Sequence, residues 1–99
     1  MKELSSKQRA YLKSLASTMD PIFQIGKASL TPEVTEAVLE AIDKRELIKV
    51  GVLKNCFDDP KEIAQILAER THSMVVQVIG KKIILYKENK DSKNKIELP

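Results

Sequence analysis

The chain has 99 residues and a mass of 11.2 kDa, with 42% hydrophobic and 31% charged residues, which is typical of a single globular domain. Its single cysteine, Cys56, and its single histidine, His72, exclude an intramolecular disulfide framework and a zinc site built from Cys and His ligands. The formal net charge of +3 permits binding to a polyanion without requiring it.

The first elements predicted along the chain are a helix and a short strand. Residues 5–8 place a serine and Gln8 at the spacing of a capping box, and apolar residues then recur every three or four positions. The helix is expected to end at Asp20-Pro21, because the residue before a proline is disfavoured in helical geometry. The β-prone run Ile22–Ile25 then predicts the first strand.

Two further helices are predicted to begin at prolines. Thr31 stands before Pro32, and Asp59 stands before Pro60, so each helix has an N-cap side chain followed by a proline at its first position. The missing N–H of proline costs nothing there, because the first amides of a helix have no partner within it. Glu62 occupies the capping-box position of the third helix, which is expected to run to about Arg70.

Three more β-prone runs complete the fold. Leu47–Leu53 predicts the second strand, and Ser73–Ile79 and Ile83–Tyr86 predict a hairpin joined by residues 80–82. Strands separated by helices pair in parallel after a crossover, whereas the hairpin adds an antiparallel pair. We therefore predict an α+β fold of two layers in the order α-β-α-β-α-β-β, with a four-stranded mixed sheet and three packed helices.

The last residues differ in composition from the rest of the chain. The segment 87–95 is charged and lacks apolar periodicity, and Ile96 and Leu98 are too few apolar residues to anchor it. We therefore expect a domain over residues 1–87 and a disordered tail over residues 88–99.

Residues that could support catalysis are sparse. His72 is expected at the end of the third helix, where a cationic side chain stabilises the last carbonyls, and Cys56 is expected to be a semi-buried packing residue. Four acids follow one side of the second helix, a pattern typical of a solvated face: Glu33, Glu36, Glu40 and Asp43. We predict that the chain is not an enzyme and has neither a cofactor nor a metal site.

The most informative motif is the segment Gly26-Lys27-Ala28-Ser29-Leu30, which joins the first strand to the start of a helix. Backbone amides at such a turn, a lysine, a hydroxyl and the helix dipole suit a phosphate oxygen, and glycine permits close approach. The segment is not a Walker A loop, because position 21 holds proline where that motif requires glycine. A plain connecting turn remains the alternative interpretation.

The distribution of charge favours the phosphate interpretation. Residues 1–30 contain five basic and two acidic residues, so they carry the basic excess of the chain. Aromatic residues make up only 4%, which disfavours an RNA-binding sheet with an aromatic platform and favours contact with the nucleic-acid backbone. The candidate contacts lie in the loop, the first helix and the hairpin: Gly26, Lys27, Ser29, Lys7, Arg9, Lys13, Lys81 and Lys82.

Several ordered motifs together resemble the CRM domain family (chloroplast RNA splicing and ribosome maturation), and at this length its stand-alone bacterial YhbY-type RNA-binding members. The resemblance runs from about Leu4 to Lys87. The matching segments are Lys7-Gln8-Arg9 with Tyr11-Leu12, Gln24-Ile25-Gly26-Lys27 with Leu30-Thr31, Glu46-Leu47-Ile48-Lys49-Val50, and Gln77-Val78-Ile79-Gly80-Lys81 with Leu85-Tyr86-Lys87.

The resemblance implies a fold like the C-terminal domain of translation initiation factor three and association with ribosomal RNA in precursors of the large (50S) subunit. Family members carry a GxxG loop at this junction, likened to the KH loop that clamps a nucleic-acid backbone. Gly26, Lys27 and Ala28 fit that pattern, whereas the fourth position is Ser29. If the loop needs a positive φ there, serine incurs a steric cost.

The predicted function is therefore RNA binding, with ribosomal RNA as partner and ribosomal proteins as possible further partners. The main alternative is a protein-interaction module on a ribosomal or translation-factor partner that contacts RNA incidentally. An enzyme acting on a phosphorylated small molecule through the same loop is a more distant alternative. With no run of 18 apolar residues and no apolar segment at the N-terminus, we expect a cytoplasmic monomer without membrane contact.

Overall fold

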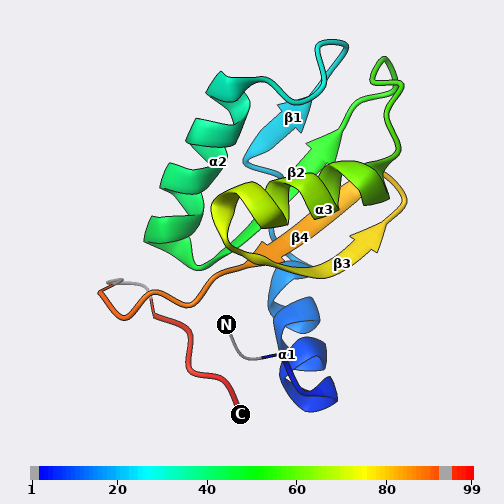
Figure 1. Ribbon diagram of the computed structural model, residues 1–99. Helices are drawn as coiled ribbons and strands as arrows, with labels where there is room; N and C mark the ends of the chain where they lie inside the picture. Colours follow the sequence, from blue (N-terminus) through cyan, green and yellow to red (C-terminus); the bar gives the residue numbers. More distant parts are fainter. Residues whose placement is uncertain (1–2, 92–94) are drawn as a thin grey trace.

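The computed structural model describes residues 3–91 and 95–99, and it confirms the predicted order of three helices and four strands (Figure 1). The elements are α1 (Ser6–Ala16), β1 (Phe23–Ile25), α2 (Pro32–Arg45), β2 (Leu47–Val52), α3 (Pro60–Thr71), β3 (Met74–Ile79) and β4 (Lys82–Tyr86). None of the helices in these described ranges has the length and apolarity that crossing a membrane requires.

The four strands form one mixed sheet in the order β1-β2-β4-β3. β1 and β2 are parallel, as expected for strands separated by a helix, whereas β4 is antiparallel to both β2 and β3. The predicted α+β class and the mixed sheet are therefore confirmed. The central strands are almost completely buried because both faces of the sheet are covered at that point.

Helices cover the two faces of the sheet unequally. α2 and α3 pack on one face over the main core, which includes Val38, Ile48, Leu67 and Leu85. α1 packs on the opposite face over a smaller cluster, whose buried members are Leu12, Ala16, Leu47, Val76, Ile84 and Tyr86. In Figure 1 the segments that follow β1 and β2 lie at the top of the molecule, whereas α1 lies at the bottom.

α1 begins as predicted and ends earlier. Ser5 Oγ accepts a hydrogen bond from the Gln8 amide at 3.1 Å, and Gln8 Oε1 accepts one from the Ser5 amide at 3.0 Å. The helix ends at Ala16 rather than at Asp20-Pro21, because the Met19 amide bonds to the Ala16 carbonyl in a tight turn. This turn redirects the chain toward the sheet before the proline is reached.

The starts of α2 and α3 are confirmed, with one difference in capping. Thr31 Oγ1 accepts a hydrogen bond from the Val34 amide at 3.1 Å, whereas Asp59 Oδ1 accepts one from the Lys61 amide at 2.9 Å. The N-cap bond of α3 therefore goes to the second helical residue rather than to Glu62. These caps satisfy amides that have no partner inside the helix.

The hairpin turn is shorter than predicted. Ile79 pairs with Lys82, so the turn consists of Gly80 and Lys81 and excludes Lys82, which belongs to β4. Gly80 has φ +54°, a conformation that glycine adopts without steric cost and that suits the first central residue of a two-residue hairpin turn.

The C-terminal segment makes contacts that the sequence did not predict. Glu46 is fully buried, and its Oε2 and Oε1 accept hydrogen bonds from the amides of Asn89 at 2.7 Å and Ile96 at 2.6 Å. Ile96 and Leu98 pack against the cluster beneath α1, which differs from the expectation that they are too few to anchor the tail. Residues 92–94 lie outside the described residues, and the domain boundary at residue 87 stays a prediction.

Candidate nucleic-acid interface

The loop between β1 and α2 closes as a tight turn. The Ser29 amide donates to the Gly26 carbonyl at 2.9 Å, and Ser29 has φ +56°, in the left-handed region that favours glycine. Ser29 therefore incurs the steric cost that a residue with a Cβ atom has at positive φ. Gly26 does not have a positive φ, so its role in the loop is not conformational.

The segment that follows β2 lies directly against Gly26. The Leu53 amide donates to the Ile25 carbonyl at 2.8 Å, which joins the two segments at the end of the parallel strands. A Cβ atom at Gly26 would lie 3.5 Å from Asn55 Oδ1 and 3.6 Å from Leu53 Cδ1, which are ordinary contact distances. A small side chain at Gly26 is therefore sterically tolerable.

The hairpin tip reaches the same end of the sheet. The Val52 amide donates to the Lys81 carbonyl at 2.7 Å, and Lys82 pairs with Gly51. Four exposed lysines therefore lie at one end of the molecule, three in connections between elements and one at the start of β4: Lys27, Lys54, Lys81 and Lys82. Within residues 3–91 and 95–99, none of these four forms an ion pair, so their charges are available to a ligand.

The part of the α1-side face that extends from this end carries polar residues together with the exposed Ile79, which pairs with Lys82. Paired residues on neighbouring strands share a face, so Gln24, Gly51 and Lys82 lie together. The Gln24 side chain lies over Gly51, where a Cβ atom would overlap it, and this accounts for the burial of Gly51. Lys49 lies two residues before Gly51 on the same face, which extends the basic surface toward α1.

The predicted residues of α1 lie at the other end of the molecule (Figure 1). Lys7 is exposed and Lys13 is partly buried, whereas the Arg9 guanidinium is engaged with the sheet. Arg9 Nη1 donates to the carbonyls of Val75 and Val76, each at 2.8 Å, at the point where β3 has an irregular register against β4. Arg9 therefore holds α1 against β3, and the predicted contacts form two separate groups.

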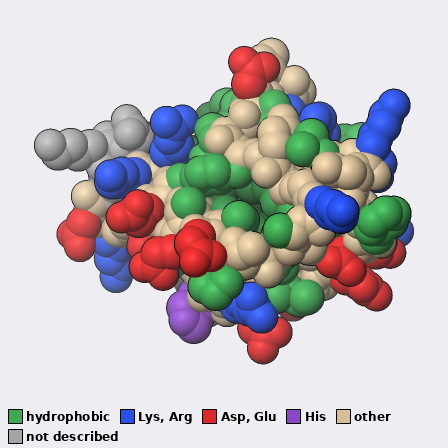
Figure 2. All heavy atoms as spheres, turned by 90° about the horizontal axis from the view of Figure 1, so that it is seen from above, with side chains coloured by type: hydrophobic (Ala, Val, Ile, Leu, Met, Phe, Trp, Pro, Cys, Tyr) green, Lys and Arg blue, Asp and Glu red, His purple; other side chains and the backbone are tan. Residues whose placement is uncertain are grey.

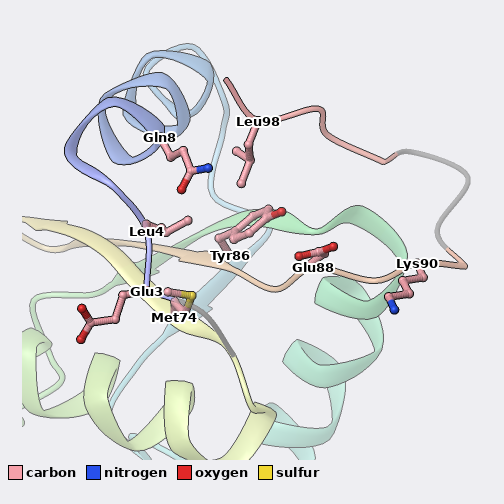
Figure 3. A pocket seen from close by; sticks show the side chains of 8 residues that line it. All are labelled: Glu3, Leu4, Gln8, Met74, Tyr86, Glu88, Lys90 and Leu98. Carbon is pink, nitrogen blue, oxygen red and sulfur yellow. The ribbon is translucent and has the colours of Figure 1, made fainter.

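Two hollows have unsuitable charge for a phosphate. A hollow of about 390 Å³ between the loop and α3 is lined by Asp58 and Glu62 as well as Arg70. Another, of about 600 Å³, lies between α1, β3 and the C-terminal segment, where Glu3, Glu88 and Lys90 are among the lining residues (Figure 3). The two carboxylates that line each hollow disfavour a bound phosphate there.

The residues considered for catalysis are dispersed. Cys56 is 5% exposed and belongs to the main core, so it is more deeply buried than predicted, whereas His72 is exposed. His72 forms the C-cap of α3 in a left-handed conformation, with φ +55°. In the described part of the chain, no group of three His, Cys, Asp or Glu side chains is placed to hold a metal ion.

These observations define a class of protein. It is an α+β domain with an exposed basic end and a glycine-containing loop after its first strand. The family model of the CRS1 / YhbY (CRM) domain matches residues 4–87, and the chain belongs to this family. The predicted resemblance is thereby confirmed.

Relatives and a solved structure agree with this assignment over almost the whole chain. A Bacillus subtilis protein named "Probable RNA-binding protein YqeI" is 45% identical over 96 residues, covering 97% of this chain and 99% of its own. A Haemophilus influenzae protein named "RNA-binding protein" is 33% identical over 99 residues, covering 100% and 98%. The solution structure of the hypothetical protein SAV1595 from Staphylococcus aureus has a TM-score of 0.80 and 49% identity, covering 98% and 100%.

The sequence did not single out every residue of this surface. Lys54 belongs to the basic end only because the segment after β2 bonds to the end of β1, and no local pattern predicts that contact. Phe57, in the same segment, is 89% exposed and has no local signal either. Their shared position in the connection between β2 and α3 is the only clue in the sequence.

Proposed function

We propose that this protein binds structured ribosomal RNA in precursors of the large ribosomal subunit, in the cytoplasm, through phosphate contacts at its basic end. The observation that carries the proposal is the meeting of the Gly26–Ser29 loop, the segment after β2 and the hairpin tip at one end of the sheet. This arrangement presents Lys27, Lys54, Lys81 and Lys82 without competing acidic partners among the described residues. Exposed, unpaired lysines suit a phosphate backbone.

Two further considerations support RNA as the partner. Relatives that align over nearly their full length carry names that describe RNA binding, and the resemblance to the CRM family implies ribosomal RNA. Lys7 and Lys13 on α1 would form a second contact, while Arg9 would position the helix. Since the molecule extends 37 Å along its longest axis, a footprint that includes both groups needs a folded RNA of comparable extent.

The salt dependence of binding tests the phosphate mechanism. We expect the affinity of the purified protein for precursor ribosomal RNA to fall steeply as salt rises, because phosphate contacts release counterions. Lys27→Ala and Lys81→Ala are each expected to weaken binding to all RNA sequences similarly and to reduce the salt slope by about one unit. Lys90→Ala, which removes an exposed lysine of the C-terminal segment, is the matched control.

Two results would contradict the proposal at different levels. Unchanged affinity and slope in both lysine variants would remove the basic end as the interface while leaving RNA binding intact. Association with large-subunit precursors that survives high salt would instead favour the protein-interaction alternative, because an apolar protein interface is not screened. Fractionation of lysates on sucrose gradients at low and high salt measures this second outcome.

A further inference from the structure

Phe57 is the most exposed large hydrophobic side chain at the basic end. Its relative exposure is 89%, compared with 43% for Leu53 in the same segment and 56% for Ile79 before the hairpin turn. It belongs to neither hydrophobic cluster of the fold. An aromatic ring left in water in this way makes no contribution to the core, so its place in the fold does not require an aromatic residue.

The backbone on both sides of Phe57 is held in place. On one side the Cys56 amide donates to the Leu53 carbonyl at 3.0 Å, and the Cys56 side chain is buried in the main core. On the other side Asp59 caps α3 through its hydrogen bond to the Lys61 amide. The ring is therefore presented from a short segment fixed at both ends, which lowers the entropy lost when a ligand contacts it.

The surroundings of Phe57 combine apolar surface with charged groups of both signs. Leu53 adds exposed apolar area. The segment that carries Phe57 also carries Lys54, Asp58 and Asp59, and it lies beside the Gly26 loop. Seen from above, this end of the molecule exposes hydrophobic side chains, with lysine, arginine and acidic groups around them (Figure 2). An exposed apolar ring on the segment that also carries the unpaired Lys54 suits a nucleotide, whose base is apolar on its faces and whose phosphate is anionic.

We propose that Phe57 stacks against an unpaired base of the bound RNA while the neighbouring lysines contact the phosphates that flank it. This inference rests on the proposed RNA-binding function and adds to it a requirement for an unpaired nucleotide. It involves one ring on a connecting segment, unlike the aromatic sheet platform that the low aromatic content disfavours. Because every base has a π-face, the contact distinguishes single-stranded from paired RNA and reads little sequence.

Binding of single-stranded and fully paired RNA of equal length tests the proposal. Phe57→Leu keeps an apolar side chain and removes the π-face, and we expect it to weaken single-strand binding roughly 5- to 100-fold. Duplex affinity and the salt slope are expected to remain unchanged, and Phe57→Tyr is expected to restore single-strand binding. Tyr11→Leu is the matched control, because Tyr11 is a 39% exposed aromatic residue on α1 at the other end of the molecule.

The outcomes separate this inference from the proposed function. If Phe57→Leu binds the single strand as tightly as the unmodified protein, while Lys27→Ala weakens it, stacking is refuted and RNA binding stands. An equal loss on single-stranded and paired RNA also refutes stacking, since it indicates a general surface effect. If the unmodified protein binds neither RNA, both proposals fail. Thermal unfolding of each variant checks the fold, which an 89% exposed side chain should not affect.

Discussion

Replacing Glu46 with Gln should release the C-terminal segment from the domain. The Glu46 carboxylate is fully buried, and each of its oxygens accepts one backbone amide, from Asn89 at 2.7 Å and from Ile96 at 2.6 Å. Lys95 Nζ lies 3.8 Å from Oε2 and adds a favourable charge. Glutamine has the same shape and only one acceptor oxygen, so its NH₂ group must face one of the two amide donors.

The expected cost follows from these two contacts. One hydrogen bond to a charged acceptor is lost, which is worth roughly 1.5–3 kcal/mol, and the other becomes a neutral bond worth roughly 1 kcal/mol. Lower desolvation of the neutral side chain offsets part of this loss. We therefore expect Glu46→Gln to lower the free energy of unfolding by about 2 kcal/mol, which shifts the melting temperature by roughly 8–16 °C for a domain of this size.

Urea unfolding followed by far-ultraviolet circular dichroism measures the effect in two chains, the full one and one that ends at Glu88. In the shorter chain the amides of Asn89 and Ile96 are absent, and the same substitution should cost less than about 0.5 kcal/mol. If Glu46→Gln costs the same free energy of unfolding in both chains, the reasoning is refuted. Glu46 and the C-terminal segment interact only if the cost of the substitution changes when the segment is removed. That result would mean that Glu46 acts only within the domain.

Three other perturbations test separate features. Arg9→Ala should lower the free energy of unfolding by roughly 1.5–3 kcal/mol, because the carbonyls of Val75 and Val76 lose a charged donor. Reduced RNA affinity with unchanged stability in urea would contradict this positioning role. Ser29→Gly should raise stability by roughly 0.5–1 kcal/mol by relieving φ +56°, and a lower melting temperature would count against it. Burial, with nearby carboxylates, raises the pKa of Tyr86 to about 12. Stability should therefore fall as pH rises from about 10 toward 12, and Tyr86→Phe should abolish that part of the loss in pH-dependent urea titrations.

The sequence predicts the elements well wherever local rules decide them. The capping box at Ser5 and the two cap-proline pairs locate the starts of all three helices, because these signals act within one turn of helix. The end of α1 is the exception. The proline predicts that the helix cannot continue past Asp20, but the helix ends earlier, at Ala16. The turn at Met19 leads the chain into the sheet, and local sequence does not predict it.

Long-range pairing explains what the sequence did not reveal. Arg9 has the local pattern of a solvated basic residue, and its partners exist only where β3 is irregular against β4, 66 and 67 residues further along the chain. The sequence around Glu46 is that of an ordinary acidic residue between a helix and a strand. Its carboxylate is nevertheless buried and accepts hydrogen bonds from amides some 40–50 positions later in the chain. Neither contact leaves a periodic signal, so only the fold assigns these residues a structural role.

The net charge of +3 understates the basic surface because the acids are placed unevenly. Lys87 pairs with Asp43 at 2.7 Å, and Lys95 lies near Glu88 at 3.6 Å, so cations at the C-terminal end are partly neutralised within the chain. The lysines at the opposite end of the sheet have no such partners among the described residues. A ligand approaching this end from solution therefore meets lysines whose charges are not neutralised within the described part of the chain. The proposed RNA contact at this end therefore depends on the distribution of charge rather than on the total charge.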